Sequence, residues 1–287
     1  MTGSAPNFTA PARFGRGIID LLSLPEFQRA LTDFVASPER CREALTDPGR
    51  LTEVYDLNQQ EVKRLLHSAR QPGMKVCWAL HRANRLGPIH ASLPLTCRAL
   101  GPRLRREVDA YWSAALPEDL QFKSEAERFA SFLRKRLRDG SLDLPVLNDL
   151  IAFELAVTEL RFLPQNAIRK TLANSETVQD ASLVLHPLIR LVSFRKDPER
   201  LLDALVNERP VPLDLAEGEF HLLVDARDDA MAIRLLDERL ANALLLFKPG
   251  ARSTLDNAEI DLLIKSALIA RWPARHAKVL PGDRSSP

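Results

Sequence analysis

The pattern of hydrophobic residues in the last third of the chain predicts a β-hairpin followed by two helices. Dense apolar segments at Glu219–Arg227 and Ala230–Leu236, partly β-branched or aromatic, predict two strands, and the acidic residues between them predict a turn. Asp237–Phe247 and Asp256–Ala270 have helical patterns, and Lys248-Pro249-Gly250 predicts the end of the first helix. A hairpin followed by small helices indicates a winged-helix-like domain.

Between Leu24 and about Phe162 the apolar residues recur at helical spacing almost throughout, which predicts a compact helical bundle. Ser23-x-x-Glu26 and Ser124-x-x-Glu127 predict capping boxes at two helix starts, and several other segments begin at proline. The remaining predicted helices are Pro38–Leu45, Asn58–Ala69, Lys75–Asn84, Pro94–Leu100, Pro102–Ala115, Ser124–Arg138 and Pro145–Phe162.

Between Leu163 and Asp180 the periodicity fades and polar residues increase, which indicates a domain boundary. Two extended segments then follow, Ser182–Pro187 and Ile189–Phe194, and after them a short helix at Pro198–Asn207. We therefore expect an α+β protein. Its parts would be a flexible arm at 1–23, a helical domain at 24–175, a winged-helix-like domain with a short antiparallel sheet at 176–277, and a tail at 278–287.

Length and composition narrow the class of protein. A chain of 287 residues is long enough for two domains. The net charge of +2 is small for a dedicated nucleic-acid binder, so a nucleic-acid partner is not expected. Three cysteines without a Cys-x-x-Cys pair fit a reducing cytoplasm, and the lack of a long apolar run argues against membrane insertion.

The candidate catalytic and metal-binding residues do not form a recognisable site. His67, His81 and His90 are not spaced as ligands on one helix face, so we expect no metal in this chain. Cys77 and Cys97 have structural surroundings and are expected to be packed core thiols. No nucleophile motif or glycine-rich phosphate loop occurs. We therefore expect no catalytic residue and no cofactor in this chain.

Two arginine-rich features remain. Arg82, Asn84 and Arg85 lie where a helix is predicted to break, and they either fix the turn by bonding helix-end carbonyls or form a protein interface. The basic runs at 98–106 and 134–138 have acidic neighbours and are interpreted as solvated helix faces. The functional alternative for these runs is a docking face for an acidic partner.

Several short motifs together resemble those of a known family. The chain is similar to the partner proteins of multinuclear non-haem iron oxidases, including the methanobactin-type and 3-thiaglutamate-type peptide-modifying pairs, from about Leu24 to Trp272. Its part 219–272 also resembles the peptide-recognition element of ribosomal-peptide pathways. The motifs that carry the resemblance are Tyr55-Asp56-Leu57, Arg82-Ala83-Asn84-Arg85 with Leu93-Pro94-x-Thr96-Cys97, Tyr111-Trp112, Glu127-x-Phe129-x-x-Phe132-Leu133 and Phe153-Glu154-Leu155-Ala156.

The resemblance implies a non-catalytic subunit that binds the leader of a precursor peptide and presents the peptide to a separate iron enzyme. The iron would belong to that partner enzyme. Arg82, Asn84 and Arg85 are then expected at the interface with the oxidase.

We expect the peptide to bind as an added strand along Met231–Leu236, with Ile189–Phe194 as the second candidate. Arg227 and Arg234 would meet acidic side chains of the leader. Because side chains alternate along a strand, only one of each neighbouring pair can face the peptide. The apolar residues expected to divide between core and groove are Phe220, Leu222, Met231 and Ile233.

Two other classes of protein compete with this interpretation. A winged-helix transcriptional regulator would need a recognition helix, and the segment Asn257–Ala270 offers Asn257 and Lys265 but has Asp256, Glu259 and Asp261 at its start. A stand-alone enzyme is opposed by the lack of a compact acid, base or ligand constellation.

Overall fold

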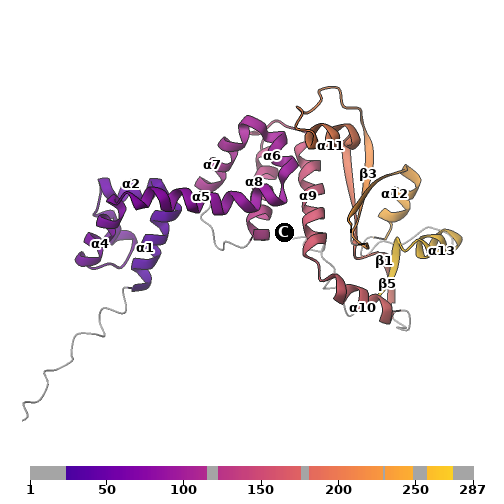
Figure 1. Cartoon of the computed structure of the whole chain (residues 1–287), viewed down its shortest axis with the longest axis horizontal. Coiled ribbons are helices and arrows are strands. Elements are labelled where there is room, and N and C mark those ends of the chain that lie inside the picture. Colours follow the sequence, from indigo (N-terminus) through magenta and orange to yellow (C-terminus); the bar gives the residue numbers. More distant parts are fainter. Residues whose placement is uncertain (1–23, 115–121, 176–180, 229, 248–256, 274–287) are drawn as a thin grey trace, which may run out of the picture. The chain divides into compact units, whose positions relative to one another are not determined.

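The computed structural model describes residues 24–114, 122–175, 181–228, 230–247 and 257–273. These residues form helices and two small antiparallel sheets, which confirms the α+β class (Figure 1). The expected arm at 1–23 and tail at 278–287 lie outside the described residues.

The chain divides into two compact units between Leu86 and Gly87. The described residues of the first unit are 24–86, and those of the second begin at Gly87. This differs from the boundary expected near residue 175. The physical reason is that helix α9 (Leu147–Phe162) packs against strand β2 (Ile189–Lys196), so the later helices share a core with the sheet.

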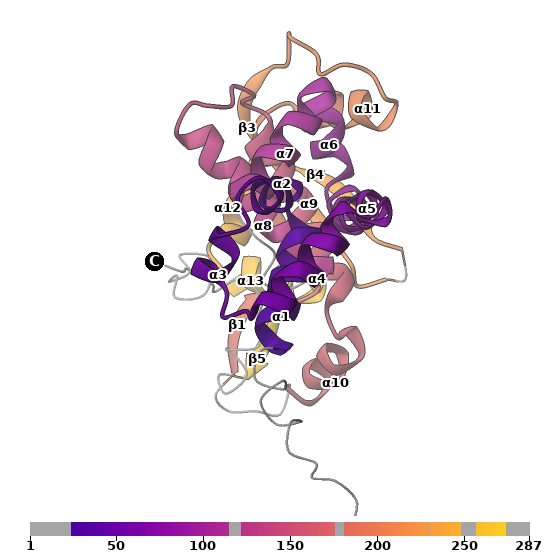
Figure 2. The ribbon, with the colours of Figure 1, turned by 90° about the vertical axis from the view of Figure 1, so that its left-hand side faces the viewer.

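The first unit is helical, and its helix caps differ from the predicted one, because Ser23 of the predicted capping box lies outside the described residues. Ser37 accepts a hydrogen bond from the Arg40 backbone N–H, and Asn58 and Glu61 form a capping box. The helices enclose one hydrophobic cluster that contains Phe34 and Leu65, and α1 lies beside α4 (Figure 2). These helices are α1 (Leu24–Ala36), α2 (Pro38–Thr46), α3 (Arg50–Val54), α4 (Gln59–Arg70) and the first part of α5 (Gly73–Ser92).

Helix α5 continues beyond its predicted end. The sequence predicts a break after Asn84, because Gly87 and Pro88 are poor helix formers and proline lacks a backbone donor. The helix nevertheless extends to Ser92 with Pro88 inside it. Ile89 and Leu93 are fully buried, and this packing stabilises the helical path through the unfavourable dipeptide.

The second unit begins with further helices, and two local predictions about them are wrong. Ser124 does not start α8, because that helix already begins at Phe122. The segment after Leu163, predicted to be irregular, contains α10, because Ile168 packs against Trp272 in a tertiary cluster. These helices are α6 (Pro94–Leu100), the 3-10 turn η2 (Gly101–Arg103), α7 (Leu104–Ala114), α8 (Phe122–Arg138), α9 and α10 (Gln165–Ser175).

Two antiparallel sheets follow. One pairs β1 with β5, and the other has the order β2-β3-β4. The predicted hairpin is confirmed as β3 and β4, with Val224 opposite Ile233. The predicted last helix stops early, because Ala267 has a positive φ of 52° and Ile269 starts β5. The elements are β1 (Ala181–Leu185), β2, α11 (Pro198–Val206), β3 (Glu217–Asp225), β4 (Ala232–Leu236), α12 (Glu238–Leu245), α13 (Asn257–Lys265) and β5 (Ile269–Pro273).

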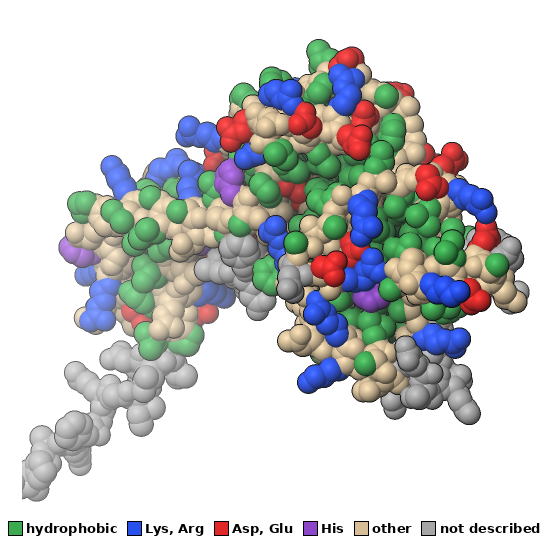
Figure 3. All heavy atoms as spheres, turned by 45° about the vertical axis from the view of Figure 1, so that its right-hand side comes forward, with side chains coloured by type: hydrophobic (Ala, Val, Ile, Leu, Met, Phe, Trp, Pro, Cys, Tyr) green, Lys and Arg blue, Asp and Glu red, His purple; other side chains and the backbone are tan. Residues whose placement is uncertain are grey.

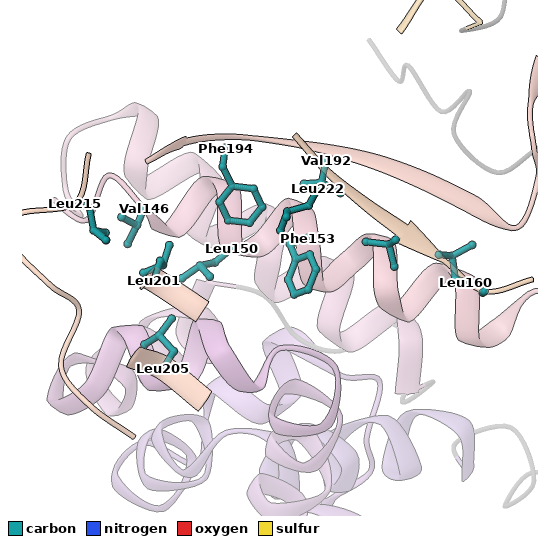
Figure 4. Packing of buried hydrophobic residues seen from close by; sticks show 12 residues of the cluster. Val146, Leu150, Phe153, Leu160, Val192, Phe194, Leu201, Leu205, Leu215 and Leu222 are labelled. Atoms are coloured by element: carbon teal, nitrogen blue, oxygen red, sulfur yellow. The ribbon is translucent and has the colours of Figure 1, made fainter. Parts of the chain in front are cut away.

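Helices cover both faces of the three-stranded sheet (Figure 1). On one face Phe153 of α9 packs with Phe194 and Leu222 of the sheet (Figure 4). On the other face Leu244 of α12 packs with Leu223. Strands β2 and β3 therefore contribute buried residues to both layers, whereas β4 is largely exposed; β2 and β4 are the two edge strands of the sheet.

Candidate functional site

Strand β4 presents an edge that no described residue occupies. On one side it pairs with β3, from Asp225 opposite Ala232 to His221 opposite Leu236. Beyond β4 the sheet has no further strand among the described residues. The edge of a sheet offers a row of backbone N–H and C=O groups that can pair with another extended chain. This edge can therefore accept a strand.

The side chains of β4 continue the hydrophobic face of the sheet into solvent. Ile233 and Leu235 lie directly opposite Val224 and Leu222, so all four side chains point to the same face. Val224 and Leu222 are buried beneath α9, but Ile233 is 48% and Leu235 41% exposed. In the space-filling view, hydrophobic side chains reach the surface of the second unit among charged ones (Figure 3). An apolar strip thus accompanies the free edge.

The opposite face of β4 carries a charge cluster. The buried Asp225 carboxylate accepts hydrogen bonds from Arg227 Nη2 at 2.6 Å, Arg227 Nε at 2.9 Å and Arg234 Nη2 at 3.1 Å. Burial acts to raise the pKa of Asp225, but the hydrogen bonds and charges of the two arginines outweigh burial and hold the pKa below its usual range. Arg234 remains largely exposed and can bind a second anionic group.

The predicted peptide-binding residues fall into three groups. Leu222 is buried in the core, and Phe220 and Met231 are half-buried against the core. Ile233 and Arg234 lie together on the exposed edge strand, on opposite faces. Leu235 belongs with Ile233 but was not predicted, although its position two residues along the strand is a sufficient signal.

Arg227 does not have the surroundings predicted for it. Besides binding Asp225, it donates from Nη1 to the carbonyl oxygens of Ser266 at 2.9 Å and Ala267 at 2.8 Å. These bonds tie the end of β3 to the segment after α13. The Arg227 guanidinium is therefore engaged in hydrogen bonds within the fold. Of the two arginines, Arg234 is the more exposed and is the one that can contact an acidic peptide.

The second candidate strand, β2, has a less open edge. The backbone N–H of Arg195 donates to Asp149 Oδ2 of α9 at 2.9 Å, and the register with β3 shifts between Phe194 and Lys196. A side chain therefore already occupies part of this edge. This favours β4 over β2 as the strand that accepts a peptide.

The predicted partner-interface residues do not form one turn. Arg82 and Asn84 are exposed on α5, whereas Arg85 is buried, and all three lie inside the helix rather than at its end. The interpretation of this cluster as a cap on helix-end carbonyls is therefore wrong. Arg82 and Asn84 lie at the surface of the first unit.

One serine, one histidine and one glutamate approach each other on the sheet. Ser193 Oγ lies 3.0 Å from His221 Nδ1, and His221 Nε2 lies 3.7 Å from Glu219 Oε1. Ser193 and His221 are direct partners in the β2–β3 register. Cross-strand polar pairs of this kind stabilise sheets. We interpret the contact as structural.

A buried carboxylate joins two helices of the second unit. Glu154 of α9 accepts hydrogen bonds from the backbone N–H groups of Leu95 at 2.5 Å and Thr96 at 2.8 Å, and so caps the start of α6. Burial raises the pKa of the neighbouring Cys97 thiol to about 12, and the Glu154 charge adds to this effect. Cys97 is therefore a protonated core thiol, as predicted, whereas Cys77 is exposed, contrary to the prediction.

The variant Glu154→Gln is expected to reduce the pH dependence of stability. Burial raises the pKa of Glu154 to about 7, against the counteracting hydrogen bonds from Thr96 and Leu95. The folded state holds the Glu154 proton more tightly than the unfolded chain does. The contribution of this proton to the free energy of unfolding is therefore complete below about pH 4.5 and is lost as the pH rises to about 7. The loss is on the order of 3 kcal/mol.

Urea unfolding at about pH 5 and about pH 8 measures this effect. Burial lowers the pKa of His186 to about 4 and opposes this effect equally in both proteins. Between the two pH values the free energy of unfolding of the wild type should therefore fall relative to that of Glu154→Gln. An equal fall in both proteins would show that Glu154 does not titrate in this range.

The described residues contain no group of three or more His, Cys, Asp or Glu side chains placed to hold a metal ion. Among the helices in the described ranges, none combines the length and the hydrophobicity needed to cross a bilayer. The chain matches no protein-family model, and no curated protein is significantly similar to it.

Proposed function

We propose that the protein is a non-catalytic partner subunit that binds the leader of a ribosomally made precursor peptide. It would present the peptide to a separate multinuclear non-haem iron oxidase, which would hold the iron. The observation that carries the peptide part of the proposal is the unoccupied edge of β4 beside exposed Ile233 and Leu235. The oxidase part rests on the sequence resemblance, and the cytoplasmic location rests on the three cysteines without a Cys-x-x-Cys pair.

A peptide would bind by strand addition. Main-chain hydrogen bonds to β4 would supply affinity, and alternate side chains would supply selectivity. One set of peptide side chains would lie beside Ile233 and Leu235, and the other set would lie beside Arg234. The favoured ligand is thus an extended segment in which apolar and acidic residues alternate. We interpret β3, β4, α12 and α13 as a winged-helix-like recognition element for such a segment.

Proline in β4 is expected to weaken leader binding. Successive backbone N–H groups of a strand point to opposite sides, so one of Arg234→Pro and Leu235→Pro removes a bond to β3 and the other removes an outward donor. The variant that loses the outward donor should stay folded and bind the leader at least about tenfold more weakly. Fluorescence anisotropy with a labelled synthetic peptide in which apolar and acidic residues alternate measures the affinity, and circular dichroism monitors the fold.

Each proline variant has a matched control at the same position. Arg234→Ala and Leu235→Ala remove the side chain but keep the backbone donor. The proposal requires the folded proline variant to bind more weakly than its alanine counterpart. Equal affinities would mean that the peptide does not pair with this edge.

A further inference from the structure

The solvent face of α5 in the first unit is apolar. Met74 and Trp78 pack into the hydrophobic cluster of that unit, yet Val76 and Leu80 are each 59% exposed and lie one turn apart. Ala83, a further turn along, is also exposed. The outward face of a surface helix is normally polar, so adjacent exposed apolar side chains are typical of a binding surface.

Exposed positive charge occurs on α5 and on the helix that precedes it, α4. Lys63, Arg64 and Arg70 of α4 and Lys75 of α5 are exposed, and none of them takes part in an ion pair of the described residues. No Asp or Glu occurs anywhere from Val62 to Arg106. The basic run at 98–106 lies at the end of this long segment without acidic residues.

The same unit pairs its cations elsewhere. Arg29 binds Glu26 at 3.1 Å, Arg40 binds Asp33 at 2.9 Å, and Arg42 binds Glu39 at 2.7 Å. In α1 and α2 acidic groups pair with the cations, whereas no acidic residue follows Glu61 in α4 or occurs in α5, where Val76 and Leu80 are exposed. A ligand that covers this region must supply the negative charge.

The two helices are consecutive in the first unit. They are joined at Gln71-Pro72, where the Lys75 backbone N–H donates to the Pro72 carbonyl oxygen at 3.2 Å. Both bury side chains in one hydrophobic cluster, so their other faces lie outside it. We name this region the α4–α5 surface, and its defining residues are Lys63, Arg64, Arg70, Lys75, Val76 and Leu80.

The chemistry of the surface selects among possible ligands. A second copy of the chain would place like charges against each other in a two-fold contact. Phosphate groups of nucleic acid would satisfy the cations but not Val76 and Leu80. Two large apolar side chains without an exposed aromatic residue bury too little area for stable attachment to a lipid surface. An acidic protein surface with apolar residues at its centre satisfies both features.

We propose that the α4–α5 surface is the docking surface for the partner oxidase, which binds it through an acidic face with an apolar centre. This inference rests on the proposed function. Electrostatic attraction accelerates association and depends on salt, and the apolar centre supplies contact area.

The test isolates the iron oxidase that copurifies with this chain from its native host and measures its binding to the whole chain, by titration calorimetry at about 50 mM and about 500 mM salt. Wild-type affinity should fall at the higher salt concentration. Reversal of all four charges (K63E/R64E/R70E/K75E) should lower the affinity at low salt about 100-fold and reverse the salt dependence, because salt then screens a repulsion. The variant V76Q/L80Q should lower the affinity about tenfold and keep the salt dependence.

Two controls separate this surface from the rest of the molecule. The variant K265E/R271E reverses exposed charges in the second unit, and its affinity for the oxidase should equal that of the wild type. All α4–α5 variants should bind the leader peptide normally, because β4 is unchanged. Circular dichroism confirms that each variant is folded.

The contradictory outcomes are distinguishable. If the wild type binds no oxidase, both the proposed function and this inference fail. If the oxidase binds the α4–α5 variants as tightly as the wild type, only this inference fails. Loss of binding to a DNA duplex or to anionic vesicles in the charge-reversed variant, with oxidase binding intact, would assign the surface to that ligand instead.

Discussion

Replacement of Phe194 by alanine is expected to lower the free energy of unfolding by about 3 to 5 kcal/mol. The side chain is 1% exposed and lies on β2, in the layer between the sheet and α9. Its ring contacts that of Phe153 edge-on, with centroids 6.1 Å apart. Alanine would remove this contact and leave a cavity that two packed layers fill only in part.

Chemical denaturation of the variant measures the loss, and Phe162→Ala is the matched control. Phe162 ends α9 and is 57% exposed, so the same substitution there should cost less than about 1 kcal/mol. If the two substitutions had equal effects, the sheet and α9 would not form the main core of the second unit.

The substitution Asp225→Ala is expected to cost about 3 to 5 kcal/mol. The carboxylate is buried, and the Arg227 guanidinium that it binds with both oxygens is mostly buried. Removal of one member of such a pair leaves the other charge without compensation in a poorly hydrated place. The loss should also loosen β4, because Arg234 would lose its bond to β3.

The control for this substitution is an exposed pair of similar geometry. Arg200 Nη2 donates to both Asp214 oxygens at 3.0 Å, but the two side chains are largely exposed. Asp214→Ala should therefore change the free energy of unfolding by less than about 1 kcal/mol. Thermal and urea unfolding of both variants measures the difference, and a small loss for Asp225→Ala would mean that water reaches Arg227.

Local signals in the sequence were sufficient to predict many of the helices and strands. Proline at the start and glycine at the end predicted α6 at its observed bounds, Pro94–Leu100. Alternating apolar residues around an acidic turn predicted the β3–β4 hairpin. This helix and this hairpin depend on residues that are close together in the sequence, so the sequence pattern is enough to predict them.

The features of the fold that the sequence did not predict depend on contacts between residues far apart in the chain. Helix α5 passes through Gly87 and Pro88 because Ile89 and Leu93 are buried, and β5 forms because β1 pairs with it. The observed boundary between the two units differs from the predicted one because the residues of α9 pack on the sheet. None of these contacts leaves a local pattern that outweighs the opposing propensity.

The same distinction applies to the candidate site. The edge strand and Arg234 follow from the alternation of residues in the hairpin. The sequence does not reveal that Arg227 binds within the fold, because its bonds to Ser266 and Ala267 join segments far apart in the sequence. The α4–α5 surface could have been recognised from the missing acidic residues, whereas the exposure of Val76 and Leu80 required the folded helix.

The pairing of β1 with β5 also determines the order in which the second unit can be completed during synthesis. Ala181 pairs with Pro273, and Trp272 completes the cluster that contains Ile168, Val184 and Leu188. The ribosome must therefore release Trp272 before β1 has a partner and this cluster is closed. Until then the nascent chain exposes an unpaired strand, and a chaperone that binds extended apolar segments would recognise it.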